Sequence, residues 1–573
     1  MDRNSIIGII LIVAILLGYQ VYTSPSAEER ARAQLVQDSL ANAQIAEQAR
    51  QAELAAQQQR LQVDTTTTLA AAPDTGFNAD SLRQARLAGR FGLFSAAAEG
   101  TNEVITLENG KLEIGINTFG ARPGVIRLKE YTTYDKTPLL LADPDSGDFE
   151  YSFFLGNLKI STRDLHFKAE KLGSTGVRLI APTNDPGKRL AITYKLDSVD
   201  WFVDVTAELI GLSEVDPRNV MFHWNLLGPA TEKHLDGQRQ KSTVYYKYMT
   251  EDRNYLSESS ADSIKLETRT NWVAFKQDFF TVAMVHPTGF AANGSEIAVD
   301  LTTDPRHTKR YDAKLFFDQA PGGTVLLPMK LYLGPNHYNT LRRTEIPQFD
   351  KIIDLGWGIF GWMNRWLVIP IFNFFGQFNL SYGIIILLLT VAIKLLLMPI
   401  AYRNQKSSAR MKALRPEIEA INKKFPAEEA LKRQQANMDL YRKAGVSPAA
   451  GCVPMLLQIP VLYAMFRFFP SSIELRQQPF LWADDLSSYD SIATLPFNIP
   501  AYGTHVSLFT LLMAASTIIY TVINSKQMPQ QQSMPGMKTM MYIFPVMMLF
   551  FMNSLPAGLS YYYLLANLIS ILQ

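Results

Sequence analysis

The chain has 573 residues, 47% of which are hydrophobic, and its formal net charge at pH 7 is only +2. A chain of this length exceeds one ordinary domain, and a near-neutral charge excludes the overall basic field that a general nucleic-acid-binding protein uses. The only cysteine is Cys452, so no intrachain disulfide can form, and the sequence argues against thiol or metal chemistry.

Residues 1–24 carry a basic residue, Arg3, ahead of an apolar run at 6–22. This pattern is typical of a cleaved signal peptide or of a membrane anchor. We interpret it as an anchor, because the run is longer than a signal core of about 7–15 residues and the TSPSAEE that follows is a weak cleavage site.

Residues 25–100 are predicted to form a linker. The part at 27–64 is rich in Ala, Gln, Glu and Arg and has no Gly or Pro, which indicates a solvated helix or weak coiled coil, or else a plain spacer. The segment TTTTLAAAPDTG interrupts any such helix, and the next ordered region is expected to begin near Thr101.

Residues 101–345 consist of short alternating segments such as RLAITYKLDS and WFVDVTAELIG, separated by Gly, Pro, Asn and Asp. This alternation predicts an all-β domain of sandwich type. Residues 350–378 are apolar but interrupted by charges, and they carry Trp357, Trp362 and Trp366 at spacings near one helical turn. We interpret them as an amphipathic helix that lies in the membrane interface.

The last third of the chain contains five further candidate membrane spans, each apolar over most of its length: 382–402, 450–469, 505–524, 539–553 and 556–572. With the anchor, six spans are predicted. Some contain proline, such as Pro399 and Pro460, which membrane helices tolerate when neighbours or water satisfy the freed backbone groups. Residues 381–573 are therefore predicted to form one helical core.

The two loops on either side of the span at 450–469 differ in charge. The loop at 403–445 is rich in Lys and Arg, whereas the loop at 471–504 has one basic residue, Arg476, among several acidic ones. Because cytoplasmic loops carry the excess of Lys and Arg, the first loop is predicted to be cytoplasmic. Both termini are then predicted to lie in the cytoplasm, and the β domain on the opposite side of the membrane.

Lys394 is the most informative residue of the spans, because it lies about eight residues before the cytoplasmic end of its span, a depth of roughly 12 Å. The lysine side chain shortens that path without abolishing it. None of the six predicted spans contains Asp or Glu, so no intramembrane carboxylate can pair with Lys394. A water-filled cavity around the ammonium group is the physical alternative.

Other polar side chains fall in the same cytoplasmic half of the membrane: Thr390, Gln458, Thr517, Tyr563 and Asn567. Each of them alone would indicate a local hydrogen bond between helices. Together with an unpaired lysine, they predict a hydrated groove.

The loop at 403–445 has a regular apolar pattern that predicts two helices. Met411, Leu414, Ile418 and Ile421 recur at helical spacing, Phe425-Pro426 interrupts them, and a second stripe continues with Leu431, Met438 and Tyr441. Its basic residues are candidates for contact with a partner: Arg410, Lys412, Arg415, Lys423 and Lys424. The hairpin is either a solvated positive loop or a docking surface for an anionic or protein partner.

Catalytic motifs are absent from the sequence. It contains no P-loop, GxSxG or HExxH motif, and its seven histidines are scattered. We therefore expect neither an enzyme nor a metal or cofactor site.

Several ordered segments resemble the YidC family of membrane protein insertases, in its Gram-negative form with a large periplasmic domain. They include TVAIKLLLMPI, SSARMKALRPEIEAINKKF, YRKAGVSPAAGCVPMLLQIPVLYAMFRFF, IELRQQPFLWADDLS and PAGLSYYYLLANLISILQ. The resemblance implies a mixed fold, with a periplasmic all-β supersandwich, an interfacial helix and a five-helix core that encloses a hydrophilic groove open to the cytoplasm and to lipid.

The resemblance also implies roles for residues and partners. Lys394 matches the groove arginine of the family, a departure that keeps the charge but loses the planar guanidinium fork. Thr390 and Tyr563 match groove positions. The implied partners are nascent membrane proteins, the Sec translocon, membrane lipids, and a ribosome or targeting factor at the hairpin, with no specific nucleic-acid sequence. Family members often end in a basic tail that aids ribosome contact, whereas this chain stops at Gln573.

Two other functions compete with this interpretation. A polytopic secondary transporter would also place a polar site at mid-membrane, although no inverted repeat or intramembrane acid is visible in the sequence. A membrane-tethered, mutarotase-like carbohydrate-binding protein would use the β domain, and sugar binding to residues 101–345 would identify it.

Overall fold

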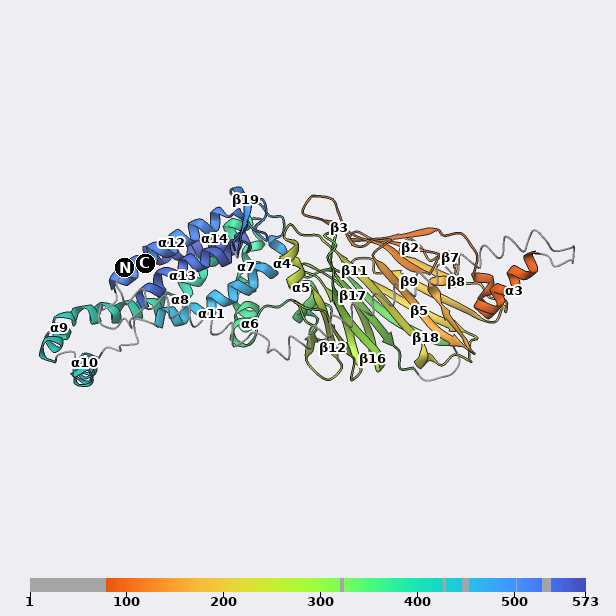
Figure 1. The fold of residues 1–573 in the computed structure, drawn as a ribbon, viewed down its shortest axis with the longest axis horizontal. Coiled ribbons are helices and arrows are strands. Elements are labelled where there is room, and N and C mark those ends of the chain that lie inside the picture. Colours follow the sequence, from red (N-terminus) through yellow and green to blue (C-terminus); the bar gives the residue numbers. More distant parts are fainter. Residues whose placement is uncertain (1–78, 320–323, 426–428, 446–452, 501, 528–536) are drawn as a thin grey trace. The chain divides into compact units, whose positions relative to one another are not determined.

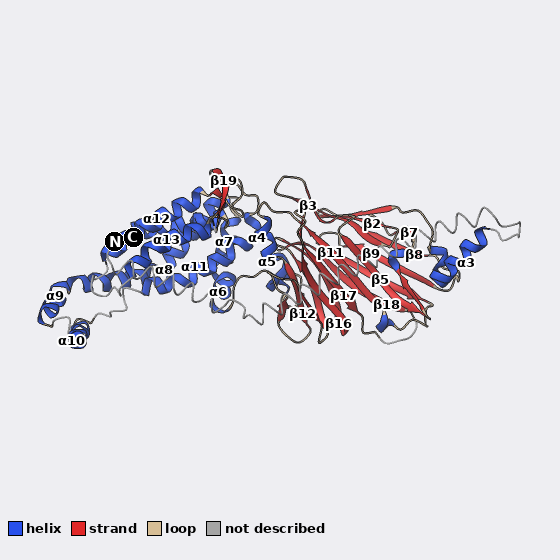
Figure 2. Cartoon of the chain, in the orientation of Figure 1, coloured by secondary structure: helices blue, strands red, loops and turns tan. Residues whose placement is uncertain are grey.

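The computed structural model describes residues 79–319, 324–425, 429–445, 453–500, 502–527 and 537–573 (Figure 1). The predicted anchor at 1–24 and most of the predicted linker lie outside the described residues. Strands make up the first part of the described chain and helices most of the second part (Figure 2).

The described chain begins with a helix, α3 (Ala79–Phe91), and a 3₁₀ segment, η1 (Gly92–Ala97). The expectation that order begins near Thr101 is therefore wrong. The reason is packing against the β domain, because Phe94 and Ala97 are fully buried and the Phe94 ring meets Phe153 edge to face at 6.0 Å. A linker prediction from composition missed these two apolar residues.

The all-β prediction is confirmed by two antiparallel sheets. The smaller sheet has the order β1 (Val104–Glu108), β2 (Leu112–Asn117), β3 (Arg122–Thr132) and β4 (Pro138–Ala142). The main path of the 14-stranded sheet is β6 (Leu158–Ser161), β5 (Gly147–Leu155), β11 (Met221–Pro229), β17 (His307–Phe316), β16 (Phe280–Leu301), β18 (Val325–Pro335), β10 (Phe202–Ile210), β9 (Arg189–Leu196), β8 (Gly176–Ala181) and β7 (Lys168–Lys171). Off this path lie β12 (Thr243–Tyr248), β13 (Arg253–Tyr255), β14 (Asp262–Lys265) and β15 (Thr270–Lys276). Short helical turns are η2 (Thr162–Asp164), η3 (Pro217–Asn219) and α4 (Leu235–Gln240).

Strand β16 joins two parts of the large sheet. Its first residues pair with β15 and β18, and its last residues pair with β14 and β17. Between them the register shifts near Gly289 and Gly294, which both have φ of 85°. Only glycine adopts such φ values without strain, so the two glycines let one strand turn from one set of partners to the other.

The segment after the β domain is helical but broken. It contains α5 (Tyr338–Arg343), η4 (Phe349–Ile352), α6 (Gly358–Met363), a π-helical turn η5 (Asn364–Val368) and α7 (Ile369–Gly376). The predicted interfacial helix at 350–378 thus begins later, at Gly358. Its tryptophans are exposed, with Trp357, Trp362 and Trp366 at 73%, 58% and 65%.

Helices occur at each of the five predicted core spans: α8 (Tyr382–Ala413), α11 (Val453–Phe468), α12 (Leu508–Gln527), α13 (Met537–Met552) and α14 (Ala557–Leu572). Within the described ranges, one helical stretch, Tyr382–Arg403, is long and apolar enough to cross a membrane, and Leu508–Ile523, Ile543–Met552 and Ala557–Leu572 are shorter apolar helices. The number of spans therefore stays a prediction.

Two boundaries in the helical core differ from the prediction. The span expected at 505–524 begins in a strand, since β19 (Ala493–Ile499) pairs with β20 (Gly503–Val506) and the helix starts only at Leu508. Helix α8 also continues to Ala413, past the expected start of the hairpin at 403. Apolar content could not reveal this, because a helix can continue into water once its residues are polar.

The hairpin itself is formed by α9 (Arg415–Lys424) and α10 (Ala430–Lys443). Its small core consists of buried Ile418 and Tyr441, with Leu414, Leu440 and Ala444 packed against them. Leu431 and Met438, predicted to belong to the second apolar stripe, are 76% and 45% exposed. The side chain of Met411 lies outside the described residues.

Candidate functional site

Helix α14 presents a polar stripe to its neighbours. Tyr563, Asn567 and Ser570 follow one another at spacings of four and three residues, which places them on one face of the helix. Each side chain is hydrogen-bonded to a different helix, namely α11, α12 and α8. Tyr563 and Asn567 were predicted as site residues, whereas Ser570 was not, although it continues their spacing.

Lys394 of α8 is held by Ser570. Its ammonium donates to Ser570 Oγ at 2.7 Å, and Ser570 Oγ donates in turn to the backbone oxygen of Ala566 at 2.8 Å. Lys394 is half-buried, and it forms no ion pair with a carboxylate in the part of the chain that the structure describes. An ammonium has three donors and one is directed at Ser570, so Lys394 keeps capacity for water or an anionic group.

Asn567 and Thr517, both predicted site residues, are in direct contact. Asn567 Nδ2 donates to Thr517 Oγ1 at 2.8 Å and to Ser516 Oγ at 3.0 Å. Both hydroxyls donate to the Met513 backbone oxygen of their own helix, at 2.8 and 2.7 Å. This pairing joins α12 to α14 without any charge.

The remaining predicted residues are placed less directly. The Tyr563 hydroxyl donates to the backbone oxygen of Leu462 at 2.9 Å, and half-buried Gln458 lies one turn before Leu462 on α11. Thr390 is fully buried and donates to the Ile386 backbone oxygen of its own helix at 2.7 Å. Thr390 therefore faces protein rather than an open space.

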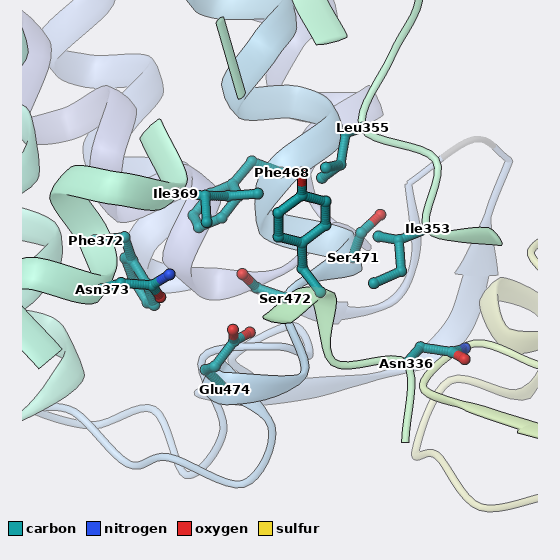
Figure 3. A pocket seen from close by; sticks show the side chains of 11 residues that line it. Asn336, Ile353, Leu355, Ile369, Phe372, Asn373, Phe468, Ser471, Ser472 and Glu474 are labelled. Carbon is teal, nitrogen blue, oxygen red and sulfur yellow. The ribbon is translucent and has the colours of Figure 1, made fainter. Parts of the chain in front are cut away.

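The structure displays a hollow elsewhere, between the end of the β domain, helix α7 and helix α11. It measures about 10 Å³, roughly the space for one water molecule. Figure 3 shows Ile369 and Phe372 of α7, Phe468 of α11, and Ser472 and Glu474 of the following loop around it. A groove around Lys394 stays a prediction.

The hairpin presents basic side chains to solvent. Arg410, Lys423 and Lys424 are exposed, and the Lys424 ammonium lies 5.8 Å from the centre of the Phe425 ring. The side chains of Lys412 and Arg415 lie outside the described residues. Two other basic residues of the hairpin form ion pairs with a carboxylate three residues earlier: Lys432 with Glu429 and Arg442 with Asp439. Among the described contacts, Lys423 and Lys424 form no ion pair.

A second polar network lies at the other end of the core and was not predicted. Asp490 is 3% exposed and accepts hydrogen bonds from the Leu508 and Phe509 backbone N–H groups at 2.8 and 3.0 Å. It also accepts from Ser507 Oγ and from Trp482 Nε1. Asp490 therefore caps the N-terminus of α12 from a distance, a role that requires the folded loop and is invisible in sequence.

Asn553 performs a related task at the turn between α13 and α14. Its Nδ2 donates to the backbone oxygens of Tyr502 and His505, both at 2.8 Å, and its Oδ1 accepts from the Ser507 N–H at 3.1 Å. The side chain is fully buried. It fixes the β19–β20 hairpin to the helices.

The same loop is joined to the β domain by a buried ion pair. Arg476 Nε donates to the two carboxylate oxygens of Glu232 at 2.9 and 3.0 Å, and Arg476 Nη2 donates to the Thr132 backbone oxygen at 2.7 Å. The two charged side chains are 3% and 10% exposed. The guanidinium also lies 5.1 Å from the centre of the Phe280 ring. From sequence, Arg476 was noted only for its charge.

Comparison with known proteins gives a consistent result. Residues 104–372 match the family model for the YidC periplasmic domain, and residues 373–573 match the model for the 60Kd inner membrane protein. A protein of Parabacteroides distasonis named membrane protein insertase YidC is 37% identical, with 100% of this chain and 91% of that protein covered. A protein of the same name from Phocaeicola vulgatus is 35% identical over 100% of this chain and 90% of its own length.

Among solved structures, the crystal structure of an active YidC insertase covers 84% of this chain and 95% of its own, at 19% identity and a TM-score of 0.31. The family models and full-length relatives confirm the resemblance found in the sequence, and the name insertase agrees with the prediction that the chain is not an enzyme. The chain therefore belongs to the YidC family of membrane protein insertases.

Proposed function

We propose that the protein inserts other proteins into the bacterial inner membrane, and that the polar surfaces of α8, α11, α12 and α14 form the path for the substrate. The observation that carries this proposal is the partner of Lys394. A cation inside an apolar helix is bound to a neutral hydroxyl, Ser570, rather than to a carboxylate. Such a cation is available to an incoming acidic group.

Exchange of the Lys394–Ser570 hydrogen bond for one to a carboxylate of the substrate is favourable. A hydrogen bond between an ammonium and a carboxylate is charge-assisted and about twice as strong as a neutral one. When an acidic side chain of the substrate approaches, Lys394 gains more from the carboxylate than it loses by leaving Ser570. Ser570 keeps its own bond to the Ala566 backbone oxygen, so no buried hydroxyl is left unsatisfied.

The second physical effect is that a polar segment of the substrate crosses a shorter stretch of hydrocarbon. A charged residue at the centre of a bilayer costs about 2.5–3.5 kcal/mol by insertion measurements. A hydrophilic groove that reaches Lys394 from the cytoplasm supplies water and hydrogen-bond partners for part of the crossing. Less of the substrate then passes through hydrocarbon, while its apolar segment leaves sideways into lipid.

The topology that fits this function has six spans with both termini in the cytoplasm. The family model names residues 104–372 periplasmic, and the Arg476–Glu232 pair joins the loop after α11 to that domain. The loop and the β domain therefore belong on the same side of the membrane. The basic hairpin, one span away from that loop, belongs in the cytoplasm, in agreement with the charge rule.

The proposed division of the chain keeps an anchor at 1–24, a linker at 25–100, a β domain at 101–345, an interfacial helix at 350–378 and a core at 381–573. The exposed basic hairpin is the proposed contact for a ribosome or targeting factor, and the core for the Sec translocon and lipids. The transporter and the mutarotase-like alternatives have no support from the full-length relatives, which are named insertases.

Site-specific crosslinking during synthesis tests the proposal. A photoreactive residue at Leu397, one turn from Lys394 and half-buried, should crosslink to a small membrane protein while it is being inserted. The same probe at Val199, which is 66% exposed on the β domain, serves as the control and should give no adduct. If Leu397 never crosslinks to a substrate that is inserted normally, the substrate path lies elsewhere.

A further inference from the structure

The β19–β20 hairpin carries no charged residue, and most of β19 is exposed. No Lys, Arg, Asp or Glu occurs in residues 491–507, which include both strands. The two strands pair with each other through Ala493 and Val506, Thr494 and His505, and Ile499 and Gly503. In the described sheets, β19 has no second strand neighbour.

The strand β19 is amphipathic with a period of two. Leu495, Phe497 and Ile499 alternate in sequence with Thr494, Pro496 and Asn498, which indicates one apolar face and one mixed face. The pairing of β19 with β20 shifts register between Thr494 and Ile499. The apolar face is only partly covered by protein, because Phe497 is 61% exposed. In a soluble protein such an alternating strand would bury its apolar face in a core.

The hairpin continues an apolar surface of the helices. The Tyr502 ring, at the hairpin turn, meets Phe550 of α13 edge to face at 5.5 Å. Beside Phe550, the same helix exposes Met547 and Phe551 at 56% and 59%. Because α13 is one of the six proposed spans, we expect these exposed apolar side chains to face lipid, and the Tyr502–Phe550 contact continues that surface onto the hairpin.

The hairpin also has a fixed position. Asn553 holds it at Tyr502 and His505, and Ser507 at its end is bonded to Asp490. In the preceding part of the loop, Phe480 packs so closely on Gly383 at the start of α8 that a Cβ there would lie 2.0 Å from the ring. These contacts keep the hairpin at the end of the core that carries the β domain (β19 is labelled in Figure 1).

We propose that the Leu495–Phe497–Ile499 face of this hairpin lies in the outer leaflet, at the boundary between lipid headgroups and acyl chains. An uncharged amphipathic element with an aromatic residue on its apolar side is suited to that boundary. The inference rests on the proposed function in placing α13 in the membrane. A protein partner fits less well, because Pro496 prevents full strand addition and no charged residue is present to form a polar rim.

Fluorescence quenching by lipid tests this proposal. In a Cys452→Ser background the chain has no other cysteine, so Phe497→Cys and Thr494→Cys can each be labelled with an environment-sensitive dye. Each protein is placed in vesicles of phosphatidylethanolamine and phosphatidylglycerol, with or without lipids that carry a quencher near the top of the acyl chain. We expect several-fold stronger quenching and bluer emission for the label at 497 than for the matched control at 494.

Two results would overturn the proposal. Weak quenching and water-like emission at both positions would place the hairpin in water. Emission shielded from water at 497 without quenching by lipid would indicate a protein cover, from this chain or another. If the Phe497→Cys protein does not elute as the parent does in size-exclusion chromatography, Leu495→Cys, on the same face, replaces it. Insertion activity of the same vesicles, measured separately, shows whether a failure concerns the hairpin or the proposed function.

Discussion

The two ends of the helical core are built differently. We call one end the outer end, following the proposed topology, and define it by the loop at 469–507 and the turn at 553–556. There, buried charged and amide side chains each form several hydrogen bonds, as in Asp490, Asn553 and Arg476. At the inner end, around Lys394, Thr517 and Asn567, each side chain makes one or two bonds to neutral partners. The outer end is therefore held by many hydrogen bonds at once, whereas the side chains of the inner end can exchange their few hydrogen bonds for others.

This difference between the two ends fits an insertase that opens toward one side of the membrane only. An insertase must admit a polar segment from the cytoplasm without opening the membrane to the periplasm. A densely bonded outer end resists opening, because breaking it would leave buried charged groups unsatisfied. A sparsely bonded inner end can exchange its hydrogen bonds for those of water or substrate at little cost.

The largest effect is expected at the outer end, from removing one partner of the Arg476–Glu232 pair. Glu232→Gln should lower the free energy of unfolding by about 3–5 kcal/mol, because a buried guanidinium loses its counter-charge. Thermal unfolding of the detergent-solubilised protein measures this effect. Adding Arg476→Met should restore much of the loss. If the loss of stability in the double variant equals the sum of the losses in the two single variants, Arg476 and Glu232 are not energetically coupled.

A smaller loss is expected for the cap of α12. Asp490→Ala removes the acceptor for two backbone N–H groups and two side chains, and should cost about 1–3 kcal/mol. The neighbouring exposed Asp484 offers the matched control, and Asp484→Ala should leave the unfolding midpoint unchanged. Equal midpoints for both variants would show that Asp490 is not a cap.

At the inner end, removing a hydrogen bond should have a modest effect on stability. Asn567→Ala breaks the two bonds to Ser516 and Thr517 and should cost about 0.5–1.5 kcal/mol, since no charge is stranded. Thermal unfolding of Asn567→Ala, measured beside Glu232→Gln and Asp490→Ala, ranks the loss of stability in the three variants. A loss at Asn567 as large as that at Glu232 would contradict the distinction between the two ends.

A pH-dependent effect is expected at His223, a half-buried residue of β11 in the β domain. Burial acts to lower the pKa of His223, but hydrogen bonds to Asp312 and Glu150 outweigh it and raise the pKa to about 9. A histidine with a raised folded pKa stabilises the protein fully below its unfolded value of about 6.5, and this contribution is lost as pH rises through about 9. His223→Gln should flatten the pH dependence of the unfolding midpoint in this range. An unchanged profile would show that His223 is not a charged partner of the two acids.

Periodicity accounts for what could be predicted from the sequence. Alternating apolar residues indicated the β domain, and helical apolar runs indicated the core helices and the two helices of the hairpin, in which Ile418 and Tyr441 are buried. The polar residues of α14 could be predicted because helical spacing also fixes which of them share a face. Ser570 continues the same spacing, so the same argument would have included it.

The outer end could not be predicted, because its contacts join residues far apart in the chain. The Arg476 side chain meets Glu232 across 244 positions, and Asn553 holds Tyr502 across 51. Loop residues of this kind have no local pattern that reveals a partner. The helix start at Leu508 was misplaced for the same reason, since it depends on the cap by Asp490.

Substitution of Lys394 tests the central claim most directly. Insertion of a small membrane protein with acidic residues in its translocated tail is measured in vesicles, beside the same protein with those residues neutralised. If Lys394 captures the acidic tail, Lys394→Arg should be tolerated, Lys394→Ala should slow the acidic substrate and spare the neutral one, and Lys394→Glu should be slowest. Equal insertion of the acidic substrate by the wild-type, Ala and Glu proteins would contradict the capture of substrate by the ammonium group that Ser570 now holds.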